Sequence, residues 1–453
     1  MKGAVKADTI LCNAKIYTKG RLMDGGIAIK NGKIAKIAKE PNLPSAFSRI
    51  DLNGCIALPG LIDVHVHLRD QGRAYEEDFF TGTAAAVSGG ITSVMDMPNN
   101  TPVTMDSASL KERMQTAQQT ILANVGFYAA FPERLEEIGR LIEQGTLAFK
   151  LYLTTQIGGV DINDDEALLQ AFAEAEKFGI PTAVHAEDKA AIDAASAAEQ
   201  RRGHSDVNAY LKAHTPDIEA KAVKRILKII RKSKAQIHFC HISSRETEVL
   251  IRESRRTGLR VTCEATPHHL LLTSSDLRRQ GMILLTDPPL RPEGTTEELW
   301  KAARSAQIDI IASDHAPHLI TQKTADSVWD VKPGIPGLET LLPLLLTKIN
   351  EGKMELHDLI RLLAENPAKI FHLRSEGFLE EGYNANITVV DMHRRGRIEA
   401  DKFHSKAKFS PFDGWHVTGK PVKTFVEGRL VMDEGKIVAK AGTGRILRSQ
   451  INV

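Results

Sequence analysis

Short apolar runs alternate with longer amphipathic stretches from residue 56 to about residue 317. Eight apolar runs follow one another: IALPGLIDVHVHL, ITSVMDMPN, ANVGFYAAF, LAFKLYL, IPTAVHAE, AQIHFCHIS, LRVTCEA and IDIIASDHAP. Between them, stretches such as 77–90, 164–179 and 217–233 carry apolar residues three and four positions apart, which predicts helices with one buried face. Eight strand–helix repeats within about 260 residues predict an α/β fold, the (β/α)₈ barrel.

An open, doubly wound parallel sheet is the alternative that this alternation allows. Such a sheet usually has fewer strands and often carries a glycine-rich nucleotide-binding turn after its first strand. Neither GxGxxG nor GxxxxGK[ST] occurs in the corresponding place in this chain. The barrel therefore explains the pattern better than the open sheet does.

The two ends of the chain have a different pattern from the middle. Residues 1–55 and 383–453 contain short β-like segments separated by turns, and Asn31-Gly32 between alternating apolar residues predicts a hairpin. Neither end is long enough to build a core alone. We expect both ends to form one small β-sandwich domain, and residues 56–382 to form the barrel domain.

Composition excludes several functional classes. The 453 residues include 42% hydrophobic and 26% charged side chains, which is ordinary for a soluble globular protein. The net charge of +2 gives no electrostatic reason to expect nucleic acid or a membrane surface as a partner. Four scattered cysteines form neither a disulfide framework nor a CxxC site, and the N-terminal residues lack the apolar core of a signal peptide. These features predict a cytoplasmic protein.

Candidate chemistry begins at the end of the first apolar run. His65 and His67 stand one residue apart among Leu, Ile and Val, so in a strand both imidazoles point to the same face. A single histidine in such a run is usually structural. Two on one face suit a metal ion, because histidine is the commonest metal ligand.

Further polar residues stand at the carboxyl ends of the other predicted strands, which meet at one mouth of a barrel and carry its catalytic groups. The residues at these ends are His65, His67, Arg69, Asn99, Lys150, His185, His241, Asp314 and His318. The four imidazoles of His65, His67, His185 and His241 and one carboxylate suit a divalent ion such as zinc. They are too many for one tetrahedral ion, so we expect two ions.

Lys150 is the unusual member of this set, because Phe149 and Leu151 flank it. Burial disfavours the charged amine, and a neutral amine can take up carbon dioxide to form an anionic, bidentate carbamate. Such a group could bridge two cations. The alternative is a lysine whose head reaches the rim and pairs with a carboxylate.

Several segments, in the same order, resemble those of the cyclic amidohydrolases of the amidohydrolase superfamily. The segments are DVHVHLRD, MPNNTP, FKLYL, VHAE, FCHISS, PPLR, ASDHAPHLITQK and GIPGLET, and they span nearly the whole chain. The resemblance implies a barrel with two zinc ions per chain. It assigns His65, His67 and Asp314 to the first ion and His185 and His241 to the second. Carboxylated Lys150 and a hydroxide would bridge the two ions.

Within this family, the segments are most similar to those of members that interconvert dihydroorotate and N-carbamoyl-aspartate in de novo pyrimidine (UMP) biosynthesis. The resemblance implies that a zinc-bound hydroxide attacks the ring carbonyl, with Asp314 as general base and then general acid. It also implies that Arg69, Asn99 and His318 bind the substrate, and that the chain forms a homodimer. A plainer explanation of Arg69 is a surface ion pair with Asp70 or Glu76.

Two positions depart from the family pattern. Gln71 stands where the family often has the proline of REPG, so we expect the loop after the first strand to have another shape. Asp287 precedes PPLR where the family often has Asn, and an ionised Asp cannot donate a hydrogen bond. We expect His214 to be an ordinary surface or loop residue, and Cys240 to face away from His241 and pack as a small hydrophobic group.

Three other functions are considered beside this one. Dihydropyrimidinase (hydantoinase) and allantoinase share the metal ligands, but they do not need an arginine for a substrate carboxylate. A non-catalytic homologue would typically have lost metal ligands, whereas every ligand position is filled here.

Overall fold

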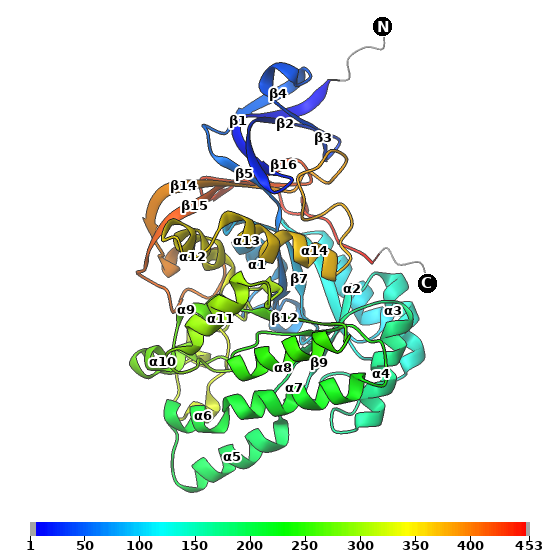
Figure 1. Cartoon of the computed structure of the whole chain (residues 1–453), viewed down its shortest axis with the longest axis vertical. Coiled ribbons are helices and arrows are strands. Elements are labelled where there is room, and N and C mark those ends of the chain that lie inside the picture. Colours follow the sequence, from blue (N-terminus) through cyan, green and yellow to red (C-terminus); the bar gives the residue numbers. More distant parts are fainter. Residues whose placement is uncertain (1–5, 450–453) are drawn as a thin grey trace.

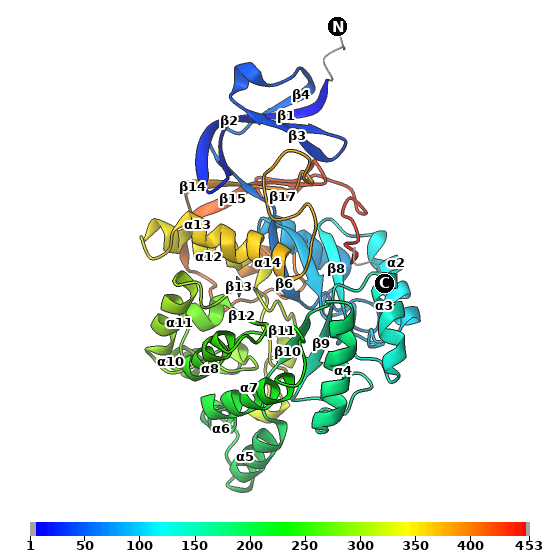
Figure 2. The same ribbon diagram turned by 45° about the vertical axis from the view of Figure 1, so that its right-hand side comes forward.

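The computed structural model describes residues 6–449, so residues 1–5 and 450–453 of the predicted terminal domain lie outside the described residues. The middle of the chain forms a parallel sheet of eight strands in sequential order (Figures 1 and 2). These strands are β6 (Leu61–Val66), β7 (Ile91–Asp96), β8 (Asn124–Ala130), β9 (Ala148–Tyr152), β10 (Thr182–His185), β11 (Ile237–Phe239), β12 (Val261–Ala265) and β13 (Ile310–Ile311). Each lies within one of the eight predicted runs, which confirms the (β/α)₈ barrel.

The barrel closes between β6 and the residues that follow β13. His67 N donates to His315 O at 2.8 Å, and Ser313 N lies 3.2 Å from both carboxylate oxygens of Asp63. A parallel bridge pairs Val66 with His315. Because β13 has only two residues, this closure depends partly on a side chain, and it brings Asp314 beside the end of β6.

Helices cover the outside of the barrel (Figure 1). They are α1 (Phe79–Ser88), α2 (Ser107–Gln118), α3 (Ile138–Gln144), α4 (Asp165–Lys177), α5 (Lys189–Arg201), α6 (Val207–Ala213), α7 (Pro216–Ile230), α8 (Arg245–Arg256), α9 (Pro267–Leu271), α10 (Ser274–Gln280), α11 (Thr295–Arg304), α12 (Leu338–Asn350), α13 (Leu356–Ile360) and α14 (Asn366–Ile370). Asp78 and Asp106 are the N-cap residues of α1 and α2. Their carboxylates accept from the third backbone N–H of each helix and so satisfy a donor that has no partner within the helix. The predicted helices within 77–90, 164–179 and 217–233 correspond to α1, α4 and α7.

Both ends of the chain meet in one mixed sheet of nine strands, as expected for a small β domain built from the termini. The strands are β1 (Ala7–Thr18), β2 (Arg21–Lys30), β3 (Lys33–Ala38), β4 (Ala46–Asp51), β5 (Ile56–Pro59), β14 (Ile387–Arg397), β15 (His416–Val426), β16 (Arg429–Asp433) and β17 (Lys436–Ile437). Asn31 and Gly32 join β2 to β3 with φ of 51° and 73°, the left-handed values of the predicted hairpin turn.

The predicted start of the barrel at residue 56 requires a correction. The strand β5 lies parallel to β1 and antiparallel to β14, so Ile56–Pro59 belongs to the terminal sheet and links its two halves. Gly60 separates β5 from β6, and a Cβ there would lie 2.3 Å from Thr92 Oγ1. The first apolar run therefore contains two strands, which periodicity alone does not separate because both are buried.

The C-terminal segment returns from the terminal sheet to the barrel. Val125 N donates to Arg445 O at 2.9 Å, and Leu447 N donates to Val125 O at 2.8 Å. The predicted domain division placed residues 383–453 wholly in the terminal domain. Through Arg445 and Leu447, however, this segment also contacts the barrel. Within residues 6–449, no helix has the length and apolar character needed to cross a membrane.

Candidate active site

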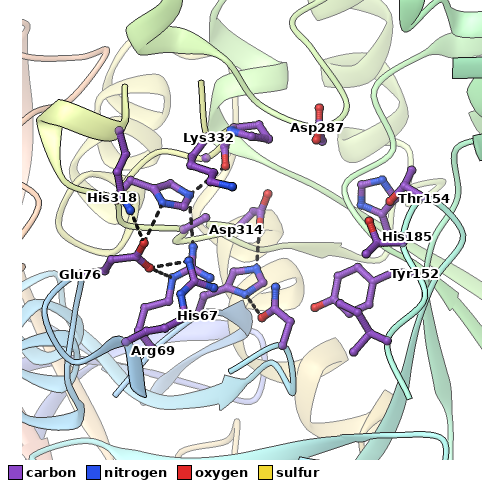
Figure 3. Close-up of a pocket in the computed structure, with 18 of the residues that line it drawn as sticks. His67, Arg69, Glu76, Tyr152, Thr154, His185, Asp287, Asp314, His318 and Lys332 are labelled. Carbon is purple, nitrogen blue, oxygen red and sulfur yellow. Dashed lines mark hydrogen bonds and ion pairs between the residues drawn. The ribbon is translucent and has the colours of Figure 1, made fainter. Parts of the chain in front are cut away.

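A pocket of about 600 Å³ opens at the carboxyl ends of the barrel strands (Figure 3). Eight of the nine residues singled out from the sequence line it: His65, His67, Arg69, Asn99, His185, His241, Asp314 and His318. The ninth, Lys150 of β9, is completely buried. The barrel thus brings together residues that are up to about 250 positions apart, as its strand order requires.

His65, His67 and Asp314 form the first group that could hold a metal ion. The Nε2 atoms of His65 and His67 each lie 3.3 Å from Asp314 Oδ1, and all three residues are buried. Burial lowers the pKa of both histidines, so the neutral imidazole, the form that binds a metal, is favoured. The proximity of His65 and Asp314 follows from the closure of the barrel.

His185 and His241 form a second group beside the first. His185 Nδ1 lies 3.1 Å from His241 Nε2, and the ring centroids of His65 and His241 are 5.2 Å apart. His241 Nδ1 is buried with no hydrogen-bond partner among the described residues. Glu187 Oε2 lies 3.1 Å from His185 Nε2 and orients that ring. Adjacent imidazoles of this kind are a donor set that suits a divalent cation.

Lys150 is buried beside Cys240, whose Sγ lies within 4.8 Å of a ring nitrogen of His65. Its Nζ is 2.9 Å from Cys240 Sγ and 4.9 Å from the centroid of the Tyr152 ring. Among residues 6–449, no carboxylate forms an ion pair with it, so the alternative of a lysine paired with a carboxylate at the rim is not observed. Cys240 packs in a buried apolar cluster, as predicted for a small hydrophobic group. Its predicted orientation relied on strand alternation, but β11 ends at Phe239 and His241 has φ of +29°.

Glu264, at the end of β12, was not singled out from the sequence. Its carboxylate is in hydrogen-bond contact with His65 Nδ1 and lies 3.1 Å from both His238 Nε2 and the backbone N of His241. Burial acts to raise the pKa of Glu264, but its contacts with His65 and His238 outweigh burial and hold the pKa well below its usual range. The ionised carboxylate therefore orients His65 with Nε2 toward Asp314. The sequence signal that could have identified Glu264 is a carboxylate near the end of the apolar run LRVTCEA.

Asn99 has a comparable role for the second histidine of β6. Asn99 Oδ1 lies 2.7 Å from His67 Nδ1, so that nitrogen donates and Nε2 is left as the lone-pair donor toward Asp314. Asn99 also lines the pocket. It can thus orient a metal ligand and face a substrate at the same time.

Arg69 and His318 line the wall of the pocket that lies across from His185 (Figure 3). Arg69 is buried, its Nε lies 3.5 Å from Glu76 Oε2, and its Nη2 lies 3.4 Å from His318 Nε2. The ion pair with Glu76 that was considered for Arg69 exists, but inside the protein and not on its surface. His318 Nε2 also lies 3.0 Å from the carbonyl oxygen of Pro333.

The loop after β6 has the altered shape that the missing proline predicts. Arg69, Asp70 and Gln71 have φ of 54°, 53° and 49°, and a proline at position 71 could not adopt such an angle. The carboxylate of Asp70 caps the turn by accepting from Phe79 N at 2.9 Å. Arg113 Nη1 donates to Gln71 Oε1 at 3.0 Å, and this hydrogen bond ties the loop to α2.

His214 is not the surface residue that was predicted. It is buried, its Nδ1 lies 3.2 Å from Glu187 Oε1, and its ring stacks on Tyr210 with centroids 4.3 Å apart. Asp287 lines the pocket and accepts a hydrogen bond from the hydroxyl of Tyr210. Glu187, His214 and the half-buried Asp287 form a further group whose oxygen and nitrogen atoms lie close together.

Comparisons with known proteins agree with this geometry. Residues 56–431 match the profile of the amidohydrolase family. The chain is 37% identical over 426 residues to a dihydroorotase from Methanothermobacter thermautotrophicus, covering 94% of both proteins. It is 36% identical over 436 residues to a dihydroorotase from Pyrococcus abyssi, covering 96% of this chain and 97% of that protein. The solved L-hydantoinase (dihydropyrimidinase) from Arthrobacter aurescens matches with a TM-score of 0.94 at 30% identity, covering 98% of this chain and 100% of that one.

Proposed function

Because this chain belongs to the amidohydrolase family, we propose that it catalyses the dihydroorotase reaction. It is a hydrolase that acts on a cyclic amide and interconverts dihydroorotate and N-carbamoyl-L-aspartate, a step of pyrimidine biosynthesis. The observation that carries this proposal is the buried guanidinium of Arg69 on the wall of a pocket that also contains His65, His67 and Asp314. Such a pocket offers one side for a substrate carboxylate and another for the scissile amide.

We propose two zinc ions as the metals. His65, His67 and Asp314 would hold one ion, and His185 and His241 would hold the other, because these groups supply imidazoles and a carboxylate close together. When bound, the ions would supply an acidified water molecule and polarise the scissile carbonyl group.

Carboxylated Lys150 is the bridge that we propose between the two ions. Lys150 of β9 is fully buried, carries no carboxylate partner among the described residues, and contacts Cys240, whose Sγ lies within 4.8 Å of a ring nitrogen of His65. An uncharged amine in this position can react with carbon dioxide, and the carbamate would then add the anionic ligand that the two histidines of the second group lack.

Asp314 is the residue that we propose to move protons. Its carboxylate lines the pocket and faces His65 and His67, so it stands within reach of a water molecule held at the metal site. In ring opening it would accept the proton of the attacking water and deliver it to the leaving ring nitrogen. In ring closure it would act in the reverse order.

Arg69, Asn99 and His318 are the residues that we propose to bind the substrate. The guanidinium of Arg69 can hold a carboxylate through two parallel hydrogen bonds. Asn99 and His318 line the same pocket as Arg69. Recognition of the carboxylate at this wall would orient the ring with its amide toward Asp314.

Hydantoinase activity is the second candidate, because the L-hydantoinase of Arthrobacter aurescens shares the fold over 98% of this chain. Hydantoin rings without a carboxylate would leave the buried guanidinium of Arg69 without a substrate partner, so we favour the carboxylated ring.

The test is a direct assay of the purified, zinc-loaded protein with N-carbamoyl-L-aspartate, dihydroorotate, dihydrouracil, hydantoin and allantoin. One charge-assisted contact predicts that kcat/KM for the carboxylated ring exceeds that for dihydrouracil by about 10-fold to 100-fold. Asp314→Ala serves as the inactive control. Faster turnover of hydantoin or allantoin than of N-carbamoyl-L-aspartate would reject the proposal in favour of another cyclic amidohydrolase.

A further inference from the structure

A second arginine shares the carboxylate that contacts Arg69. Arg73 Nη2 lies 2.5 Å from Glu76 Oε2, and Arg69 Nε lies 3.5 Å from the same oxygen. Arg73 lines the pocket with 23% of its side chain exposed, whereas Glu76 is 1% exposed. Two guanidinium groups therefore flank one buried carboxylate at the substrate wall, and the more exposed of the two is Arg73.

Glu76 is fixed in an ionised state. Gln322 Nε2 donates to its Oε1 at 2.8 Å, and His318 Nδ1 lies 3.6 Å from the same oxygen (Figure 3). Burial acts to raise the pKa of Glu76, but its contact with His318, the charge of Arg69, its hydrogen bond from Gln322 and the charge of Arg73 together lower it to about 2. Glu76 is therefore a permanent negative charge at neutral pH.

Charge balance shows why one arginine is not enough at this wall. Arg69 and Glu76 alone would sum to zero, so a substrate carboxylate would enter a buried place with no net positive charge to offset it. Arg73 changes the sum to +1, which matches a single carboxylate. Burial lowers the pKa of His318 to about 4, so its ring is neutral. Lys332 lines the rim of the pocket but is exposed, so water and salt screen its charge.

The backbone directs Arg73 toward the pocket. The left-handed residues 69–71 turn the chain, and Gly72 N donates to Thr101 O at 3.0 Å, where a Cβ on Gly72 would lie only 3.0 Å from Thr101. Arg73 N donates to Asp70 O at 3.0 Å, and Glu76 N donates to Arg73 O at 2.9 Å. The altered loop that Gln71 permits is thus the element that carries the second arginine.

We propose that Arg73 is a second substrate-binding arginine, and that Arg69 and Arg73, held across Glu76, form a subsite for the one carboxylate of the ring. This subsite would set the preference for carboxylated over uncharged rings. The inference rests on the proposed function, whose substrate class it makes more specific. Asp314, which also lines this pocket, faces the two histidines of β6.

The test compares Arg73→Gln, Arg73→Lys and the double variant Arg73→Gln/Glu76→Gln with the wild type. Arg134→Gln is the matched control, because Arg134 also pairs with a glutamate three residues later but is 72% exposed and does not line the pocket. The measurements are KM and kcat for N-carbamoyl-L-aspartate, and calorimetric binding of orotate and uracil, which differ by the carboxylate. Thermal unfolding checks that each variant is folded.

Arg73→Gln should raise KM and weaken orotate binding by about 10-fold or more, the loss typical of one charge-assisted contact, with kcat changed little. Uracil binding should not change. Arg73→Lys should retain part of the orotate affinity. The double variant should recover most of it, because Arg69 is then free of an opposing carboxylate and the net charge returns to +1.

Three results would overturn the inference: unchanged orotate affinity in Arg73→Gln, equal losses for orotate and uracil, or no recovery in the double variant. A wild-type protein that binds orotate through Arg73 but does not convert N-carbamoyl-L-aspartate would instead reject the proposed function. The two failures are therefore distinguishable.

Discussion

A buried ion pair supports the loop that carries both arginines, and it provides a quantitative prediction. Arg113 of α2 and Asp96 of β7 are each 1% exposed, and Arg113 Nη2 lies 2.7 Å from Asp96 Oδ2. Asp96 Oδ1 accepts from Leu68 N at 2.9 Å, and Arg113 Nη1 donates to Gln71 Oε1 at 3.0 Å. The pair therefore fixes the chain on both sides of Arg69.

The perturbation is Arg113→Met, which keeps an apolar stem against Phe79 but removes the charge that neutralises Asp96. Removing one partner of a buried ion pair typically costs about 3–5 kcal/mol, because the other charge stays buried and unpaired. Burial already raises the pKa of Asp96 against the effect of Arg113, so protonation of the unpaired carboxyl limits the loss. In Asp96→Asn/Arg113→Met no charge remains, and we expect a loss of about 1–2 kcal/mol from the missing hydrogen bonds.

Calorimetric unfolding at one fixed scan rate can measure these differences. An unfolding entropy of roughly 2.1 cal/mol/K per residue makes 4 kcal/mol equal to about 4 °C in Tm for a chain of this length. We therefore expect Tm to fall by about 3–5 °C in Arg113→Met and by about 1–2 °C in the double variant. An unchanged Tm in the single variant, or a double variant that melts below the single one, would refute this reasoning.

Three further predictions concern the metals and the pH dependence of stability. Lys150→Ala should lose bound zinc and activity together, with partial rescue by short carboxylic acids; wild-type zinc content measured by elemental analysis would contradict the bridge. Glu264→Gln should weaken zinc binding by about 10-fold to 100-fold in a chelator titration, because His65 loses the carboxylate that orients it; equal affinity would contradict this role. Lys323 is buried, its Nζ donates to the carbonyls of Leu285 and Lys332, and burial lowers its pKa to about 7. The unfolded chain then binds more protons than the folded chain between pH 7 and 10.5, so stability should rise with pH across this window, and Lys323→Met should abolish that rise; an identical pH dependence in the variant would contradict the assignment.

The order of the barrel strands could be predicted because the signal is repeated. Each strand is a short apolar run followed by a helix of period 3.6, and the strand ends carry the polar residues. Once the barrel is assumed, the convergence of His65, His185, His241 and Asp314 follows from topology alone. The departure at Gln71 also predicted an altered loop, since only the absence of proline permits a positive φ there.

Other features depended on contacts that no local pattern encodes. Glu76 and Glu264 are buried because cationic or imidazole groups surround them, and an acidic residue alone gives no sign of such partners. His214 is buried for the same reason, next to Glu187. Strand alternation could not predict the orientation of Cys240, because β11 ends at Phe239. The homodimer and the cytoplasmic location stay predictions.

The most direct test of the two-metal site is a crystal structure of the zinc-loaded protein with anomalous diffraction recorded at the zinc edge. The account predicts two peaks at the mouth of the barrel, one held by His65, His67 and Asp314 and one held by His185 and His241, with density for a carboxylated Lys150 between them. A single peak, or zinc bound only at Glu187, His214 and Asp287, would contradict it.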